Sequence, residues 1–60
     1  MTNLKALRES KGVSQQTVAD YLGITRQAYG NYETGKRQAD YAALLRLAAF
    51  FSVSVDALLQ

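Results

Sequence analysis

The sequence of 60 residues contains no cysteine, no histidine and no proline. Without cysteine there is no disulfide framework and no thiolate metal site, and without histidine the common zinc patterns and histidine-dependent triads are excluded. The five carboxylates are dispersed along the chain and form no recognisable acid–base pair. We therefore expect no enzymatic activity, no metal, no cofactor and no small-molecule ligand.

Long apolar runs are also missing. The longest, residues 41–45 and 47–51, are separated by Arg46 and together fall well short of the roughly 20 residues of a membrane helix. The first residues lack the basic and then apolar pattern of an export signal. A sequence without cysteine fits the reducing cytoplasm. We expect a soluble, cytoplasmic protein with no membrane partner.

The size and charge of the chain set two further limits. A chain this short buries only about 60% of its unfolded surface, so we expect residues 1–60 to form one domain. Apolar residues make up 48% of the sequence and charged residues 20%, as in ordinary globular proteins. The net charge of +2 indicates a mild preference for anionic partners and is weak evidence alone.

The spacing of apolar residues predicts an all-α fold. These residues recur every three to four positions, and no alternating strand pattern competes with them. We expect a short fifth helix after Ser54, preceded by four helices at about residues 3–11, 15–22, 26–33 and 41–51.

The second and third of these helices are close enough to form a helix-turn-helix. Ser14 and Thr25 are suitable N-cap residues, and Gly23 can adopt the left-handed conformation that ends a helix. Only Ile24 lies between Gly23 and Thr25, so the connection is tight.

The helix at 26–33 has two different faces. At 100° per residue, one face carries Ala28, Tyr29 and Tyr32. The opposite face carries Arg26, Gln27, Gly30 and Asn31. In the DNA major groove, arginine can pair with guanine, and glutamine or asparagine with adenine, each discriminating by about 1–3 kcal/mol. A polar face on an isolated helix is more often only a solvated surface, so the surrounding pattern decides.

Residues 15–34 resemble the helix-turn-helix of the Cro and phage-repressor family, also called the xenobiotic-response-element family. The positions that carry the resemblance are Val18, Ala19, Leu22 and Gly23, followed by Ile24, Tyr29 and Tyr32. Further similarity lies at Leu4, Leu7 and Arg8, at residues 32–37, at 53–56 and at Leu58 and Leu59. The resemblance covers nearly the whole chain. It implies a compact five-helix, lambda-repressor-like DNA-binding domain from a bacterial or phage transcription regulator, most simply a repressor associated with the nucleoid.

The resemblance also implies roles for individual residues. The residues expected to contact bases are Arg26, Gln27 and Asn31, with Ala28 at the edge. Those expected to contact phosphates are Gln15, Gln16, Lys36 and Arg37, with Thr25 serving mainly as an N-cap. The family pattern also pairs Arg8 with Glu33, and a charge on the apolar side of the first helix needs such a partner.

Two positions depart from the family pattern. Gly30 lies in the middle of the recognition helix, where glycine costs about 1 kcal/mol relative to alanine and removes a side chain from the outer face. Ala39 replaces the proline often found before the fourth helix. Neither change alters the expected class of function.

The helix at 41–51 carries more apolar residues than one core requires. Leu45 and Phe50 lie partly or wholly outside its inward stripe, and with Leu59 they could form a homodimer surface. An equally good interpretation is that these residues are exposed singly, as is common on protein surfaces. A third alternative is that a segment after Gln60 carries dimerisation. A dimer would suit an inverted-repeat operator in double-stranded DNA. The alternative function is an antitoxin-like or anti-repressor module that binds another protein through the same residues.

Overall fold

Five α-helices and no strand make up the part of the chain that the computed structural model describes, residues 3–59. They are α1 (Leu4–Lys11), α2 (Gln15–Leu22), α3 (Arg26–Thr34), α4 (Tyr41–Phe51) and α5 (Val55–Leu58). The predicted all-α fold and the number of helices are confirmed, with α3 extending to Thr34 rather than residue 33. Within this part of the chain no helix is both long and apolar enough to cross a bilayer.

Short side chains fix where four of the helices begin. In each case the N-cap oxygen accepts a hydrogen bond from the backbone N–H three residues later, which satisfies a donor that the helix cannot. The N-caps of α2, α3, α4 and α5 are Ser14, Thr25, Asp40 and Ser54. These local bonds explain why the predicted starts agree closely with the structure.

Gly23 makes the abrupt turn between α2 and α3. Its φ is 74°, in the left-handed region that residues with a Cβ disfavour. Its backbone N–H donates to Ala19 and Asp20, and the N–H of Ile24 donates to Ala19 at 3.0 Å. The bonds end α2 in the manner of a Schellman motif, and α3 begins after Thr25.

The core lies between the helices and takes residues from all five. Ala19 is fully buried, and its small side chain lets α2 and α3 approach closely. Tyr29 of α3 is also fully buried, whereas Tyr32 is half-buried. The buried residues are Leu4, Val18, Ala19, Leu22, Tyr29, Leu47, Ala48, Phe51 and Leu58. The face of α3 that carries Tyr29 and Tyr32 is therefore the one that packs against the core.

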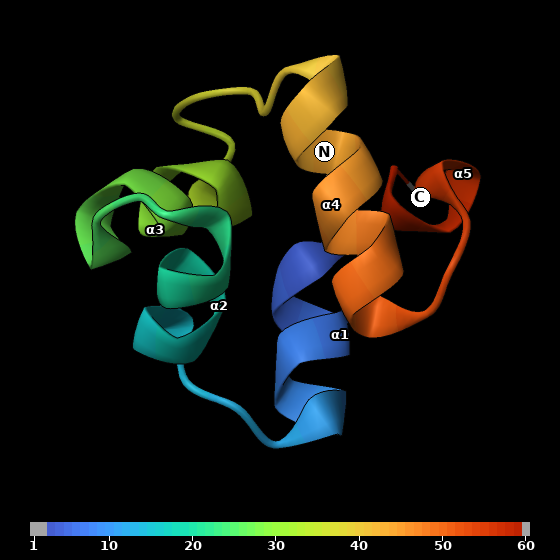
Figure 1. The fold of residues 1–60 in the computed structure, drawn as a ribbon, viewed down its shortest axis with the longest axis horizontal. Helices are drawn as coiled ribbons and strands as arrows, with labels where there is room; N and C mark the ends of the chain where they lie inside the picture. Colours follow the sequence, from blue (N-terminus) through green and yellow to red (C-terminus); the bar gives the residue numbers. More distant parts are fainter. Residues whose placement is uncertain (1–2, 60) are drawn as a thin grey trace.

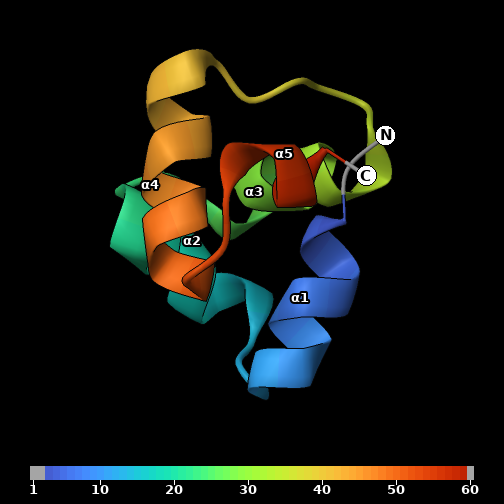
Figure 2. The same ribbon diagram turned by 90° about the vertical axis from the view of Figure 1, so that its right-hand side faces the viewer.

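The arrangement leaves one face of α3 uncovered. In Figure 1, α3 lies at one side of the molecule and α5 at the other, with α4 between them. Figure 2 shows the start of α1 next to α5, where the N–H of Asn3 donates to the carbonyl of Leu58 at 2.7 Å. Packing therefore fixes the inner side of α3 and leaves its outer side at the surface.

Arg46 ties α4 to the C-terminal end of α2. Its Nη2 donates to the carbonyl oxygen of Tyr21 at 2.6 Å and its Nη1 to that of Leu22 at 3.2 Å. The guanidinium group lies 5.4 Å from the centre of the Tyr21 ring. A cation at this position satisfies terminal carbonyl groups and complements the helix dipole.

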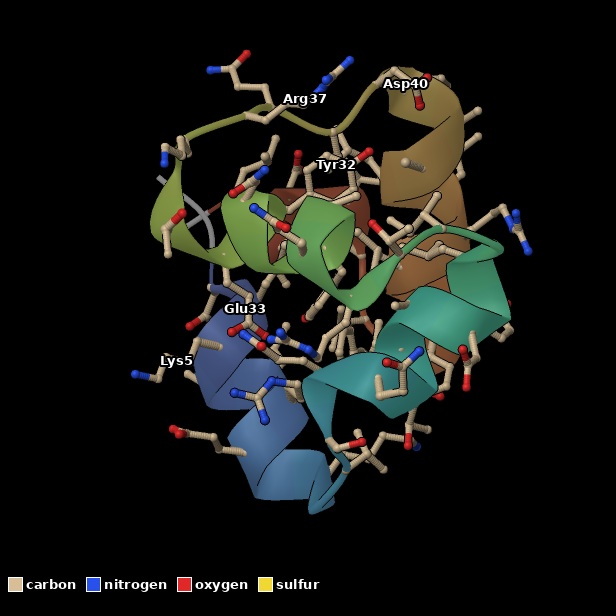
Figure 3. The ribbon with its side chains drawn as sticks, turned by 90° about the vertical axis from the view of Figure 1, so that its left-hand side faces the viewer. Lys5, Tyr32, Glu33, Arg37 and Asp40 are labelled. Carbon is tan, nitrogen blue, oxygen red and sulfur yellow. The ribbon has the colours of Figure 1, made fainter. Side chains whose placement is uncertain are left out.

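We expect Arg46→Ala to lower the free energy of unfolding by about 1–2 kcal/mol, because two charge-assisted hydrogen bonds are lost. The melting temperature should fall by roughly 5–10 °C in a domain of this size. Thermal unfolding followed by circular dichroism measures this. The matched control is Lys5→Ala, which removes a cation from the exposed outer side of α1 (Figure 3). Equal melting temperatures for both variants would contradict the role assigned to Arg46.

Candidate nucleic-acid interface

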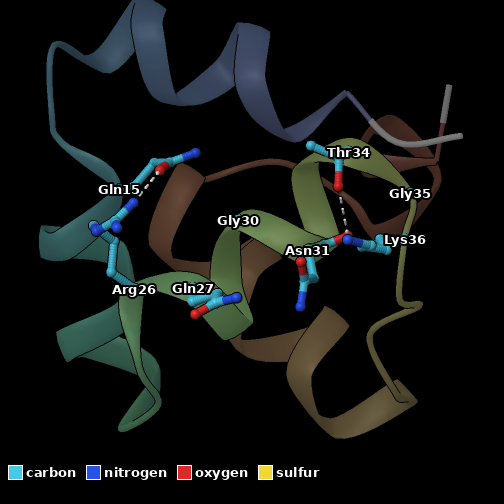
Figure 4. A pocket seen from close by; sticks show the side chains of 8 residues that line it. All are labelled: Gln15, Arg26, Gln27, Gly30, Asn31, Thr34, Gly35 and Lys36. Atoms are coloured by element: carbon cyan, nitrogen blue, oxygen red, sulfur yellow. Dashed lines mark hydrogen bonds between the residues drawn. The ribbon is translucent and has the colours of Figure 1, made fainter.

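The outer face of α3 carries the polar residues that the sequence places there. Arg26 and Gln27 are exposed, and Gly30 and Asn31 are partly exposed. Figure 4 shows the side chains of Arg26, Gln27 and Asn31 on the outer side of the helix. This face is presented to solvent because Tyr29, on the opposite side, is locked in the core.

A shallow concave surface extends from this face to its neighbours. It combines the first residue of α2, the outer face of α3 and the turn after α3 (Figure 4). Its lining contains two cations and no carboxylate, which suits a polyanion. The lining residues are Gln15, Arg26, Gln27, Gly30, Asn31, Thr34, Gly35 and Lys36. We refer to these eight residues as the concave surface.

The structure brings some predicted contact residues onto the concave surface and leaves others outside it. Gln16 is exposed on α2, where its Nε2 donates to Asp20 at 2.8 Å. Thr25 serves as the N-cap, since its Oγ1 accepts from the N–H of Ala28 at 3.1 Å. Ala28 itself is half-buried, and Arg37 lines a different groove. These four are positioned around the concave surface rather than in it.

A largely buried ion pair joins α1 to α3. Arg8 Nε donates to Glu33 Oε2 at 2.6 Å, and Arg8 Nη1 donates to the carbonyl oxygen of Val13 at 3.1 Å. The side chain of Glu33 is only 3% exposed and that of Arg8 14%. Figure 3 shows Glu33 on the side of α3 that faces α1. The structure thus contains the pair that the sequence predicts, and it holds α3 against α1.

Two opposing effects act on the carboxyl group of Glu33. Burial raises its pKa. Hydrogen bonds from Arg8 and Gln15, together with the nearby hydroxyl group of Tyr29, lower it by more, so the net pKa is below the usual value. Conversely, the hydrogen bond and charge of Glu33 raise the pKa of Arg8. Burial, and then the adjacent Glu33, raises the pKa of Tyr29. The carboxylate therefore stays charged at neutral pH.

Gln15 connects this ion pair to the outer face of α3. Its Nε2 donates to Glu33 Oε1 at 3.0 Å, and its Oε1 accepts from Arg26 Nη1 at 3.4 Å (Figure 4). The sequence resemblance gives Gln15 only a phosphate contact, and this second role was missed. The amide has two N–H donors, so the one not used by Glu33 remains available to a phosphate.

The three residues considered for a dimer surface have different surroundings. Leu45 and Leu59 are exposed, at 47% and 49%, and Tyr41 on the same helix as Leu45 is 68% exposed. Phe50 is half-buried instead, with its ring 4.8 Å from that of Tyr21. A substitution at Phe50 would therefore disturb the fold. Tyr41, which the sequence argument omitted, is the larger exposed apolar group on α4.

Comparison with known families agrees with this geometry. A family model described as helix-turn-helix matches residues 4–58, which include all five helices. The chain belongs to the helix-turn-helix family. The family predicted from Val18, Ala19, Leu22 and Gly23 is thereby confirmed, and α2 and α3 are its two-helix motif.

The relatives of this helix-turn-helix chain include the following three proteins from Bacillus subtilis (strain 168). It is 54% identical over 57 residues to the SPbeta prophage-derived uncharacterized HTH-type transcriptional regulator YonR, covering 95% of this chain and 53% of the relative. It is 48% identical to the uncharacterized HTH-type transcriptional regulator YqaE, and the match covers 97% of this chain and 50% of the relative. It is 41% identical to the HTH-type transcriptional regulator AnsR, and the match covers 98% of this chain and 51% of the relative. The chain thus spans about half the length of these relatives.

Proposed function

We propose that this protein binds double-stranded DNA in a sequence-specific manner as a bacterial or phage transcription regulator. The observation that carries the proposal is the outer face of α3, which presents an arginine and two amides while Tyr29 fixes the opposite face in the core. The relatives named as HTH-type transcriptional regulators support it. The protein would act on DNA in the cytoplasm, most simply as a repressor that blocks access to a promoter.

In this proposal α3 enters the major groove and its side chains contact base edges. Arg26 suits guanine, and Gln27 and Asn31 suit adenine, because each can form two parallel hydrogen bonds with that base. Ala28 lies at the edge of the contact, where its methyl group can meet that of thymine. These contacts would decide which sequence is preferred.

Phosphate contacts would fix the orientation of the helix. Lys36 and Arg37 follow α3 and would bind phosphates on one side of the groove. Gln15 and Gln16, at the start of α2, would bind a phosphate on the other side, helped by the positive end of the helix dipole. Thr25 would add a weaker contact, since its hydroxyl oxygen already caps α3.

We further propose that two copies bind an inverted repeat. One domain offers few base contacts, whereas a two-fold dimer can contact two half-sites about 34 Å apart. Tyr41, Leu45 and Leu59 are large apolar side chains left exposed in the single chain, as a dimer surface requires.

Selection of bound duplexes from a random DNA pool tests the proposal, followed by titration of the selected duplex at several salt concentrations. We expect one preferred sequence with two-fold symmetry. The logarithm of the binding constant should fall with the logarithm of salt concentration with a slope of about −2 for each domain, from the phosphates at Lys36 and Arg37. A pool that yields no preferred sequence would refute the regulator function, and an unpaired half-site would refute only the dimer.

A further inference from the structure

Gly30 lies in the middle of α3 and does not use the conformational freedom of glycine. The glycines with positive φ in the described chain are Gly12, Gly23 and Gly35, at 75°, 74° and 79°. Gly30 instead has ordinary helical geometry within Arg26–Thr34. The backbone at this position therefore accepts any residue that forms a helix.

Packing inside the protein does not require glycine either. A Cβ atom added at Gly30 would meet only the Nε2 and Oε1 atoms of Gln15, both at 3.8 Å. This is an ordinary van der Waals distance, so alanine fits without any movement of its neighbours. Because alanine also favours a helix more than glycine does, the folded chain alone should prefer alanine here.

The missing side chain leaves a gap in the concave surface. Arg26 and Gln27 precede Gly30 by one helical turn and Thr34 follows it by one turn, so these residues surround it on the helix surface. Figure 4 shows the bare ribbon of α3 at Gly30 between the side chains of Gln15, Gln27 and Asn31. The gap leaves the helix backbone at Gly30 without a side chain between it and a group from outside.

We propose that Gly30 is the point at which α3 approaches the DNA most closely, with base-pair edges entering the gap. The inference rests on the proposed function. Among the residues around the gap that are expected to contact bases, Asn31 has the shortest side chain and needs the closest approach. Hydrogen bonds weaken steeply when they lengthen, so even a methyl group that held the helix away would impair several of them together. Gly30 thus contributes to DNA sequence specificity by setting how closely α3 approaches the base pairs, and not through a side-chain contact of its own.

The test compares Gly30→Ala with the unaltered protein. We expect the variant to melt about 4–8 °C higher, because alanine stabilises the helix. We expect it to bind the selected duplex about tenfold more weakly, the loss typical of one inserted methyl group in a close contact. Its binding to a scrambled duplex of the same composition should be nearly unchanged, since phosphate contacts tolerate a looser position.

Ala49→Gly is the matched control, because it makes the reverse exchange on the exposed surface of α4. It should lower the melting temperature and leave the affinity for the selected duplex unchanged. The inference is overturned if Gly30→Ala binds the selected duplex as tightly as the unaltered protein, or if it is less stable. If Arg26→Ala weakens binding and Gly30→Ala does not, only this inference fails. If the unaltered protein does not distinguish the two duplexes, the proposed function fails with it.

Discussion

Replacement of Arg26 by alanine is expected to weaken binding to the selected duplex by about ten- to a hundredfold. The guanidinium group can form two hydrogen bonds with one guanine, and such a pair contributes about 1–3 kcal/mol of discrimination. Asn31→Ala should weaken binding to a similar extent, because it removes the corresponding pair with adenine. Gel-shift or fluorescence-anisotropy titration at one fixed salt concentration measures both.

Two controls separate base contact from charge and from folding. Arg26→Lys keeps the charge and loses the planar fork, so it should recover part of the affinity and little of the sequence preference. Lys5→Ala removes one positive charge from an exposed position on α1 and should change binding only slightly. Arg26 is exposed and Asn31 partly exposed, so melting temperatures should stay close to that of the unaltered protein. Equal binding by Arg26→Ala and Lys5→Ala would contradict the proposed contact between Arg26 and a base.

Glu33→Ala is expected to destabilise the fold by about 3 kcal/mol. The change leaves the guanidinium group of Arg8 largely buried without its carboxylate, and breaking a buried pair in this way costs about 3–5 kcal/mol. That is a large part of the total stability of a domain this small. Urea unfolding at pH 7 measures the loss. The double variant Arg8→Met with Glu33→Leu removes both charges and should regain much of it.

The pH dependence of stability gives a second readout of the same pair. The pKa of Glu33 is lower in the folded state than its ordinary value of 4.5, so its contribution is complete above about pH 4.5 and is lost as the pH falls through the folded pKa. Glu33→Gln cannot titrate there. The difference in stability between the unaltered protein and Glu33→Gln should therefore shrink from pH 7 to pH 3. A difference independent of pH would show that the charge of Glu33 contributes nothing.

The features predicted well from the sequence are those set by neighbouring residues. The N-caps at Ser14 and Thr25 each act on a backbone group three residues away, so the starts of these helices are encoded locally. The division of α3 into two faces follows from the helical period alone. Arg8 and Glu33 are 25 residues apart in sequence, and their pairing was predicted because the family pattern pairs these positions and because a charge on an apolar face requires a partner.

The features missed depend on where flexible side chains reach across the fold. Arg46 contacts carbonyl oxygens 24 and 25 residues before it, and Gln15 contacts a carboxylate 18 residues after it. Both residues resemble ordinary polar surface positions in the sequence, and nothing in their neighbours specifies a distant partner. Phe50 was similarly uncertain, because its inner or outer position depends on Tyr21 of α2.

If α3 contacts DNA as proposed, the hydrogen bonds of Gln15 link the DNA preference of the protein to its stability. Arg26 shares an amide group with the carboxylate that anchors α3, so replacing Arg26 also changes the surroundings of Glu33. Asn31 has no such link through its side chain to the ion pair among the bonds of the described chain. In the proposed function, variation at residue 31 would change the DNA preference without altering the bonds around Glu33, whereas variation at residue 26 would also change the hydrogen bonds of Gln15.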